Sequence, residues 1–215
     1  MGVIDAGRRD QELLAQLAQG AVAPLYAIVG EEDLLRDMAL GALKSALLGE
    51  GESDFNCDLF YGDDVSGREI VTCASEVAVF AARRVVVVKA ADKLPARECD
   101  AILPYLKEPN DTTSVIFVAP KLDGRLKFTQ ALAKAAVTVD CSPLRESQWL
   151  PWLRQDAERV GVRLNEEAIE LLKERNKKVM LKRLENSTSE GLVRVLVSDD
   201  ASRGAMVELQ CESAP

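Results

Sequence analysis

Five apolar runs of strand length alternate with segments of helical length, and this alternation constrains the fold more than any other feature of the sequence. Several runs are continuous rather than alternating in polarity, as in the VVVV stretch at 85–88. Continuous β-branched runs are typical of strands covered on both faces, which is the situation in a parallel sheet. The runs are LYAIV (25–29), NCDLFY (56–61), RVVVVK (84–89), TSVIFVA (113–119) and AVTVD (136–140).

The segments between the runs have the apolar spacing of amphipathic helices. In the first of them, over 32–48, apolar residues from Leu35 to Ala46 recur on one face, and Gly49 follows as a stop signal. The alternation of strand and helix predicts a doubly wound α/β domain over 1–141 with a mostly parallel, five-stranded sheet. Further helices are expected near 66–80, 96–107 and 125–135.

The strand pattern stops after Asp140. The next segment has helical spacing, with Pro151 expected in its first turn and Gly161 at its end. A second helix is expected after Asn165, a residue suited to capping a helix N-terminus. We therefore predict a small helical domain over 142–190. The tail, 191–215, contains two short apolar runs around a polar turn, which is typical of a pair of strands, and its structure is left open.

The first strand ends at Gly30 and a helix follows at once, which is the layout of a phosphate-binding loop. A working loop has the form G-x-x-x-x-G-K-[ST]. Here the glycine is followed by Glu31, Glu32 and Asp33, and the second glycine, the lysine and the hydroxyl residue are missing. A carboxylate about 5 Å from a phosphate charge costs about 3 kcal/mol at an effective dielectric of about 20. The same carboxylate stabilises a bare helix N-terminus by about 0.3–1 kcal/mol.

Two further strand ends lack the residues that nucleotide chemistry needs. In nucleotide hydrolases an acidic residue positions Mg²⁺, but the run at 84–89 ends in Lys89 and is followed by Ala90. The run at 113–119 is followed by Pro120 and Lys121, without a polar group that would sense a phosphate. The sequence thus predicts a nucleotide-binding fold with no bound nucleotide, no other cofactor and no catalysis of its own.

Composition excludes several classes of function. The chain contains no histidine, which removes Ser–His and Cys–His catalysis and the common zinc sites. Its five cysteines include no CxxC pair, as expected of small buried residues in a cytosolic protein. The net charge of −8 argues against a mainly electrostatic grip on nucleic acid. No apolar run approaches the roughly 20 residues that span a bilayer, so we expect a cytoplasmic protein without a membrane partner.

In their order and spacing, several segments resemble the delta subunit of bacterial DNA polymerase III. They include PLYAIVGEEDLLRDMALGALKSALL, DFNCDLFYGDDV, FAARRVVVVKAADKL, LPYLKEPNDTTSVIFVAPKLDGRLK and VTVDCSPLRESQWLPWLRQDAERVGVRL, between about Pro24 and Leu172. The resemblance implies a degenerate AAA+ module, similar to a P-loop NTPase, followed by a small helical lid. It also implies a clamp-loader subunit that binds the sliding clamp and helps to open it during DNA replication, while sibling subunits hydrolyse ATP.

The family's clamp contact is a pair of apolar residues near the end of the helix before the third strand. The resemblance assigns this pair to Val79 and Phe80, in SEVAVFAARRVVVV. If the helix runs to residue 80, the face that packs on the sheet is shared by Ile70, Ala74, Val77 and Ala81. Val79 then points roughly opposite, and Phe80 lies to the side. The alternative is that the helix ends near Ala78 and both side chains fold under the loop that leads to the strand.

A basic cluster lies in the segment KKVMLKR. Its lysines Lys177, Lys178 and Lys182 are interpreted as a solvated helix face. The alternative is contact with the backbone of primer-template DNA, since clamp loaders enclose DNA. DNA would then be an indirect partner within the complex.

The resemblance fades after about Arg175. In the family a helical collar follows and holds the loader ring together, and we expect it to be absent here. Assembly with the other clamp-loader subunits is therefore in doubt, and residues 176–215 are either family sequence or the product of a frameshift or fragment. Two other functions stay open. One is a Mg²⁺-dependent enzyme or receiver-like module, and the other is a nonfunctional truncated remnant. The acids of the Mg²⁺ alternative are Glu31, Glu32, Asp33, Asp63 and Asp64.

Overall fold

The computed structural model describes residues 3–5, 22–48, 56–78, 83–144, 146–159, 161, 163, 165, 168–171, 174, 191–197 and 204–210. The chain divides into two compact units, Met1–Gln148 and Trp149–Pro215, and each is described by itself. The domain limits expected from the sequence (1–141, 142–190 and 191–215) stay predictions.

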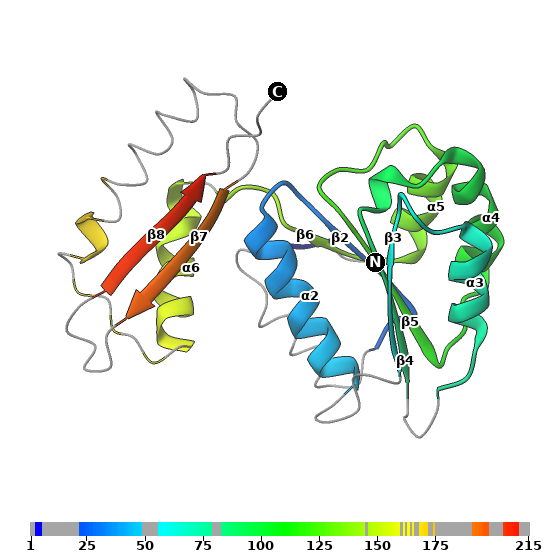
Figure 1. Cartoon of the computed structure of the whole chain (residues 1–215), viewed down its shortest axis with the longest axis horizontal. Helices are drawn as coiled ribbons and strands as arrows, with labels where there is room; N and C mark the ends of the chain where they lie inside the picture. The colour runs from blue at the N-terminus through cyan, green and yellow to red at the C-terminus, as the bar shows by residue number, and fades with distance from the viewer. Residues whose placement is uncertain are drawn as a thin grey trace. The chain divides into compact units, whose positions relative to one another are not determined.

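A parallel sheet forms the centre of the first unit (Figure 1). Its strands lie in the order β1-β6-β2-β5-β4-β3, and every pairing in it is parallel. The five predicted strands are confirmed, and a sixth, β1, joins the sheet beside β6. Three residues are too few to produce a periodic pattern, so the sequence did not reveal β1. The strands are β1 (Val3–Asp5), β2 (Leu25–Val29), β3 (Cys57–Tyr61), β4 (Arg84–Lys89), β5 (Thr113–Ala119) and β6 (Val137–Asp140).

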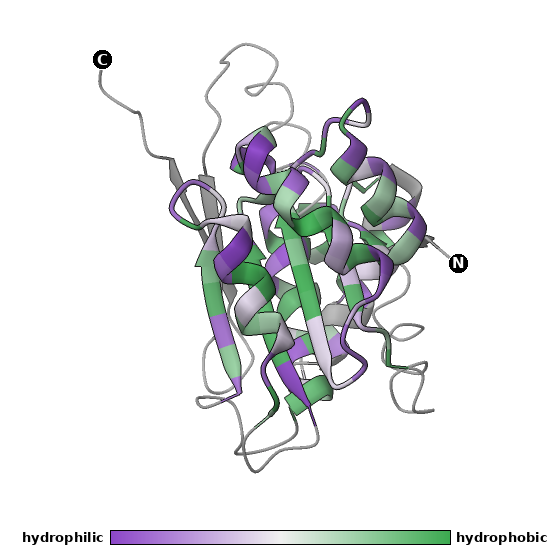
Figure 2. Cartoon of the chain, turned by 90° about the vertical axis from the view of Figure 1, so that its right-hand side faces the viewer, coloured by the Kyte–Doolittle hydropathy of each residue, from purple (hydrophilic) through white to green (hydrophobic). Residues whose placement is uncertain are grey.

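Helices cover both faces of this sheet, as the continuous apolar strands predict. Figure 1 shows α2 on one side of the strands and α3, α4 and α5 on the other. Figure 2 shows apolar residues concentrated on the central strands, with polar residues on the outer helices. The helices are α2 (Asp33–Leu48), α3 (Gly67–Ser75), α4 (Ala96–Lys107) and α5 (Lys127–Ala135), and the short 3₁₀ turn η1 (Ala91–Lys93) follows β4.

Two apolar layers hold the helices on the sheet. On one side Ile70, Ile102 and Leu132, from α3, α4 and α5, are buried in a common cluster with alternate residues of β4 and β5. In that cluster the rings of Phe117 and Phe128 pack edge to face, with centroids 5.3 Å apart. On the other side, α2 buries five leucines and Ala39.

The helix predicted over 66–80 is shorter than expected, because α3 ends at Ser75 and Glu76 is extended. In a longer helix the Ala74 carbonyl would accept a hydrogen bond from the next turn. Instead it accepts from the hydroxyl of Tyr105 (3.3 Å) and the amide of Asn110 (3.4 Å). The expectation that Val77 lies on the sheet-packing face of this helix was therefore wrong, since Val77 is 75% exposed. The expected direction of Val79 falls outside the described residues.

The second unit contains α6 (Glu146–Arg159), which begins just before the boundary, and the strands β7 (Gly191–Val197) and β8 (Gly204–Gln210). Pro151 lies inside α6 rather than in its first turn. Asn165 caps the next helical segment as predicted, since its side-chain oxygen accepts from the Ala168 amide at 2.8 Å. The strands β7 and β8 pair antiparallel, in agreement with the two apolar runs of the tail. No helix among the described residues has both the length and the hydropathy to cross a membrane.

Candidate functional site: the closed β2–α2 loop and the base of the 77–83 segment

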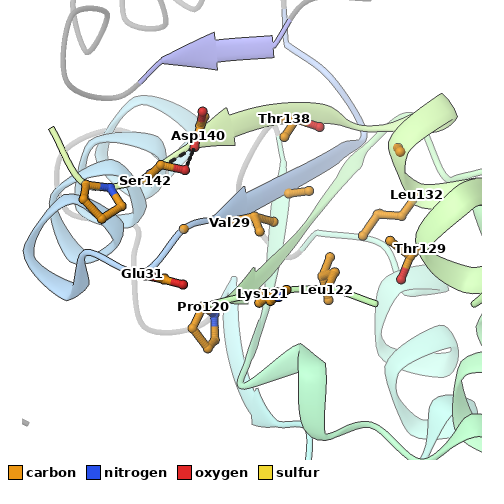
Figure 3. A pocket seen from close by; sticks show the side chains of 14 residues that line it. Val29, Glu31, Pro120, Lys121, Leu122, Thr129, Leu132, Thr138, Asp140 and Ser142 are labelled. Carbon is orange, nitrogen blue, oxygen red and sulfur yellow. Dashed lines mark hydrogen bonds between the residues drawn. The ribbon is translucent and has the colours of Figure 1, made fainter. Parts of the chain in front are cut away.

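The β2–α2 loop, Gly30–Glu32, lies at the point of the sheet where ligands bind in doubly wound proteins. The strand β2 lies between β5 and β6, and the chain continues from β2 into α2 on one face of the sheet and from β5 into α5 on the other (Figure 1). A cavity of about 530 Å³ opens beside their carboxyl ends, and Glu31, Lys121 and Asp140 line it together with mainly apolar groups (Figure 3). These three charges sum to −1, which disfavours a phosphate there.

Gly30 allows another part of the chain to pass directly over the loop. Its φ is +154°, and a Cβ built on it would lie 2.0 Å from the carbonyl carbon of Cys141 and 2.4 Å from the amide nitrogen of Ser142. Only a residue without a side chain permits this approach. The backbone that follows β6 therefore occupies the space above the loop.

Hydrogen bonds within the protein use the backbone groups of the loop. The Glu32 amide donates to the Cys141 carbonyl at 3.1 Å, and the Cys141 amide donates to the Val29 carbonyl at 2.7 Å. The Gly30 amide donates to the Ala119 carbonyl at 3.3 Å. In a phosphate loop such amides point at the ligand. Here two of them are bonded to carbonyls of neighbouring strand ends instead.

A side chain from the first turn of α2 closes the loop further. The Arg36 guanidinium donates to the Gly30 carbonyl and to the carboxylate of Asp33. Asp33 is the first residue of α2, in agreement with its expected role of complementing the helix N-terminus. The charge of Arg36 is thus directed at the loop's own carbonyl and at Asp33.

The acidic residues of the Mg²⁺ alternative are not gathered into a site. Among the described residues no group of three or more potential ligands lies close enough to hold a metal ion. Asp33 is paired with Arg36, and Asp63 lies 3.7 Å from the ammonium of Lys93. Lys89, at the end of β4, lies 3.5 Å from Asp37.

Val79 and Phe80, the pair assigned to clamp contact, lie outside the described residues, as do Lys177, Lys178 and Lys182. The structure does describe both ends of the segment that carries the apolar pair. This 77–83 segment leaves α3 after Glu76 and enters β4 at Arg84. Val77 is 75% exposed.

Arg84 joins the two ends of the 77–83 segment. Its Nη2 lies 2.7 Å from an oxygen of Asp58 on β3 and 3.1 Å from an oxygen of Glu76. The same nitrogen donates to the Cys73 thiol at 3.5 Å. The Arg84 side chain is only 9% exposed, although arginine is rarely buried unless it is paired. Sequence reasoning missed this group, because its members come from three elements.

Electrostatics keep Arg84 charged and Cys73 neutral. Burial works against the charge of Arg84, but the hydrogen bond with Cys73 and the carboxylates of Asp58 and Glu76 outweigh it, so the pKa of Arg84 is raised. Burial also raises the pKa of the Cys73 thiol to about 11, despite the hydrogen bond from Arg84. At neutral pH Arg84 is therefore a guanidinium and Cys73 a protonated thiol.

Comparisons with known proteins agree with this fold. The chain is similar to the DNA clamp loader delta protein of Bacillus subtilis, with a TM-score of 0.64 and 23% identity over 76% of this chain and 51% of that one. A DNA polymerase III gamma subunit-related protein of Thermotoga maritima is more distant, with a TM-score of 0.49 and 13% identity over 64% of this chain and 47% of that one. The chain thus spans about half the length of these two structures.

Two sequence comparisons cover different shares of the chain. Elongation factor Ts of Cytophaga hutchinsonii is 46% identical over 50 residues, which are 23% of this chain and 18% of that protein. The family model of the DNA polymerase III delta subunit matches residues 26–142, more than half of the chain. This chain therefore belongs to the DNA polymerase III delta subunit family.

Proposed function

We propose that this chain is a clamp-loader subunit that binds the sliding clamp and helps to open it during DNA replication, without hydrolysing ATP. The proposal that the chain does not hydrolyse ATP rests on the closed β2–α2 loop, in which the backbone of Cys141 and Ser142 passes over Gly30. A subunit of this family that cannot hold a nucleotide has to act by binding its protein partner, the sliding clamp. Sibling subunits would then supply the ATPase cycle.

The strand ends support the absence of catalysis. An ATPase needs a carboxylate at the end of the strand corresponding to β4 to hold Mg²⁺. Here β4 ends in Lys89, whose ammonium lies 3.5 Å from Asp37 on α2. A lysine charge at this position repels a metal ion instead of binding it.

The proposed contact with the clamp is the pair Val79 and Phe80. The family resemblance supports it, as does the 75% exposure of nearby Val77, which marks an apolar side chain leaving the core. Burial of two such side chains in a partner pocket contributes about 3–5 kcal/mol before association costs. A contribution of this size exceeds the roughly 2 kcal/mol that marks a hot spot at an interface.

Phe80→Ala tests the assignment. It should weaken binding of the purified chain to the sliding clamp of the same organism by at least about tenfold, which is about 1.4 kcal/mol, and leave the urea midpoint nearly unchanged. Leu34→Ala is the matched control, because Leu34 is also an exposed apolar residue (53%) but lies on α2. Surface plasmon resonance against immobilised clamp measures both. Equal binding by Phe80→Ala and the parent would refute the assignment of Phe80 to the clamp contact.

Other clamp-loader subunits and DNA are proposed as further partners. Lys177, Lys178 and Lys182 are proposed to contact the phosphate backbone of primer-template DNA within the complex, without sequence preference. If so, replacing the three lysines by glutamine should reduce the salt dependence of primer-template binding by the loader, and a change confined to particular DNA sequences would contradict the proposal.

A further inference from the structure

A cavity of about 530 Å³ lies on the α5 side of the sheet, beside the closed β2–α2 loop (Figure 3). The strand order β6-β2-β5 means that the connection from β5 to β6 has to cross β2, and α5 makes this crossing. Ala27 and Val29 of β2 face this side, since they belong to the apolar cluster of α3, α4 and α5 or pack against it. Thr138, the register partner of Ala27, lines the cavity from β6. The cavity is therefore space that α5 leaves open beside the carboxyl ends of β2 and β6.

The cavity differs from the position that a phosphate-binding loop offers to a nucleotide. In such a loop the anion sits at the backbone amides before the helix, and here the backbone of Cys141 and Ser142 passes over that position at Gly30. The cavity extends from the loop towards α5 instead, where Leu122 and Leu132 form part of its wall. Closure of the phosphate position thus leaves the cavity open.

The wall of the cavity is mainly apolar. Its apolar groups include Ala27, Val29, Pro120, Leu122, Leu132 and Ala133. The hydroxyl of Thr129, another residue of the wall, is buried and has no hydrogen-bond partner in the described part of the chain. Threonine in a helix adopts either of two side-chain rotamers, so rotation can offer this hydroxyl to a polar atom of a ligand.

Charged groups lie at the rim of the cavity. Glu31 follows β2, Lys121 follows β5, and Asp140 is the last residue of β6. The Asp140 carboxylate accepts from the amide of Ser142 at 2.9 Å and from its hydroxyl at 2.5 Å, whereas Glu31 and Lys121 are exposed. Because the three charges sum to −1, the rim attracts a cation and repels an anion.

We propose that this cavity binds a small organic cation, whose apolar body lies against α5 and β2 and whose ammonium group lies at Glu31 and Asp140. Protein interiors contain few voids larger than a water molecule, whereas small-molecule sites are apolar pockets of about 300–1,000 Å³ with a few polar groups. In doubly wound sheets such sites lie at the carboxyl ends of the strands. The inference goes beyond the proposed function and does not depend on clamp binding.

Tryptamine is the probe, and indole-3-propionate is the matched anion, because it carries a carboxylate where tryptamine carries its ammonium. Isothermal titration calorimetry of the full chain at low ionic strength measures both, since salt screens exposed charges. We expect one-to-one binding of tryptamine with a dissociation constant of about 0.1–10 mM, as is usual for so small a ligand, and binding of indole-3-propionate that is weaker by at least about fivefold.

Variants at the rim and in the wall locate the bound probe. Glu31→Gln should weaken tryptamine binding by about threefold, and Lys121→Gln should strengthen it by about the same factor. Ala133→Phe should weaken it by at least about tenfold, because the new ring fills the cavity from an exposed position of α5. Ala46→Phe is the matched control, since Ala46 is exposed on α2 and does not line the cavity.

The urea midpoint of each variant shows whether it folds, and the two charge variants decide the outcome if Ala133→Phe does not. Equal affinity for the two indoles, no saturation by tryptamine up to about 10 mM, or tryptamine binding that folded Ala133→Phe leaves unchanged would overturn the inference. So would a shift in the same direction for Glu31→Gln and Lys121→Gln. None of these results concerns the clamp, so the inference and the proposed function fail separately.

Discussion

Replacement of Gly30 by alanine should destabilise the first unit strongly, because the loop has no room for a side chain. The new Cβ would lie 2.0 Å from the Cys141 carbonyl carbon, whereas ordinary contact begins at 3.4 Å, so the backbone after β6 has to move by about 1.4 Å (3.4 − 2.0). That movement disrupts the hydrogen bonds of Cys141 with Val29 and Glu32. At about 1 kcal/mol for each bond, with a further 1–3 kcal/mol for overpacking, we expect a loss of about 3–5 kcal/mol in the free energy of unfolding.

Urea unfolding followed by far-UV circular dichroism measures this loss. Gly41→Ala is the control, because Gly41 lies inside α2 and a Cβ there meets no atom within 4 Å. Alanine is the better helix former by about 0.5–1 kcal/mol, so this variant should be more stable than the parent. If Gly30→Ala unfolds within about 0.5 kcal/mol of the parent, the backbone of Cys141 does not pass over the loop, and the reason given for the absence of nucleotide fails.

Two further predictions concern α3. Ser66→Ala removes a capping box in which the Glu69 amide donates to the Ser66 hydroxyl at 3.2 Å and the Glu69 carboxylate accepts from the Ser66 amide at 2.9 Å. Urea unfolding should show a loss of about 1 kcal/mol in the free energy of unfolding. Ser75→Ala should be nearly neutral, because the Ser75 hydroxyl only donates back to the Val71 carbonyl. The pKa of the Cys73 thiol is raised from 9.0 to about 11 by burial, so the folded state keeps a proton that the unfolded state loses, and stability should fall as the pH rises from about 9 to 11. The urea midpoint of Cys73→Ala should fall less over that range, and equal slopes for parent and variant would contradict the burial of the thiol.

The sheet was predictable from the sequence because its strands are long and apolar on both faces. The runs at 84–89 and 113–119 correspond to β4 and β5 without shift. The short edge strand β1 was not predictable, since Val3–Asp5 is too short to carry a pattern and pairs with β6 far along the chain.

The details of the candidate site depend on contacts that no local pattern reveals. The sequence from Glu76 to Val79 keeps an apolar spacing compatible with a helix, yet α3 ends at Ser75, where Tyr105 and Asn110 bond the Ala74 carbonyl from about 30 residues away. The loss of the phosphate-loop residues after Gly30 was visible in the sequence. The backbone that passes over that glycine was not, because it belongs to the end of β6.

The central claim is that the chain recognises the sliding clamp by contact and without ATP. The direct test is the dissociation constant of the purified chain for the sliding clamp of the same organism, measured with and without Mg²⁺ and ATP. The closed loop predicts binding in both conditions, with constants that agree within about twofold, a difference of about 0.4 kcal/mol. Binding that requires ATP, or no binding of the clamp in either condition, would contradict the account.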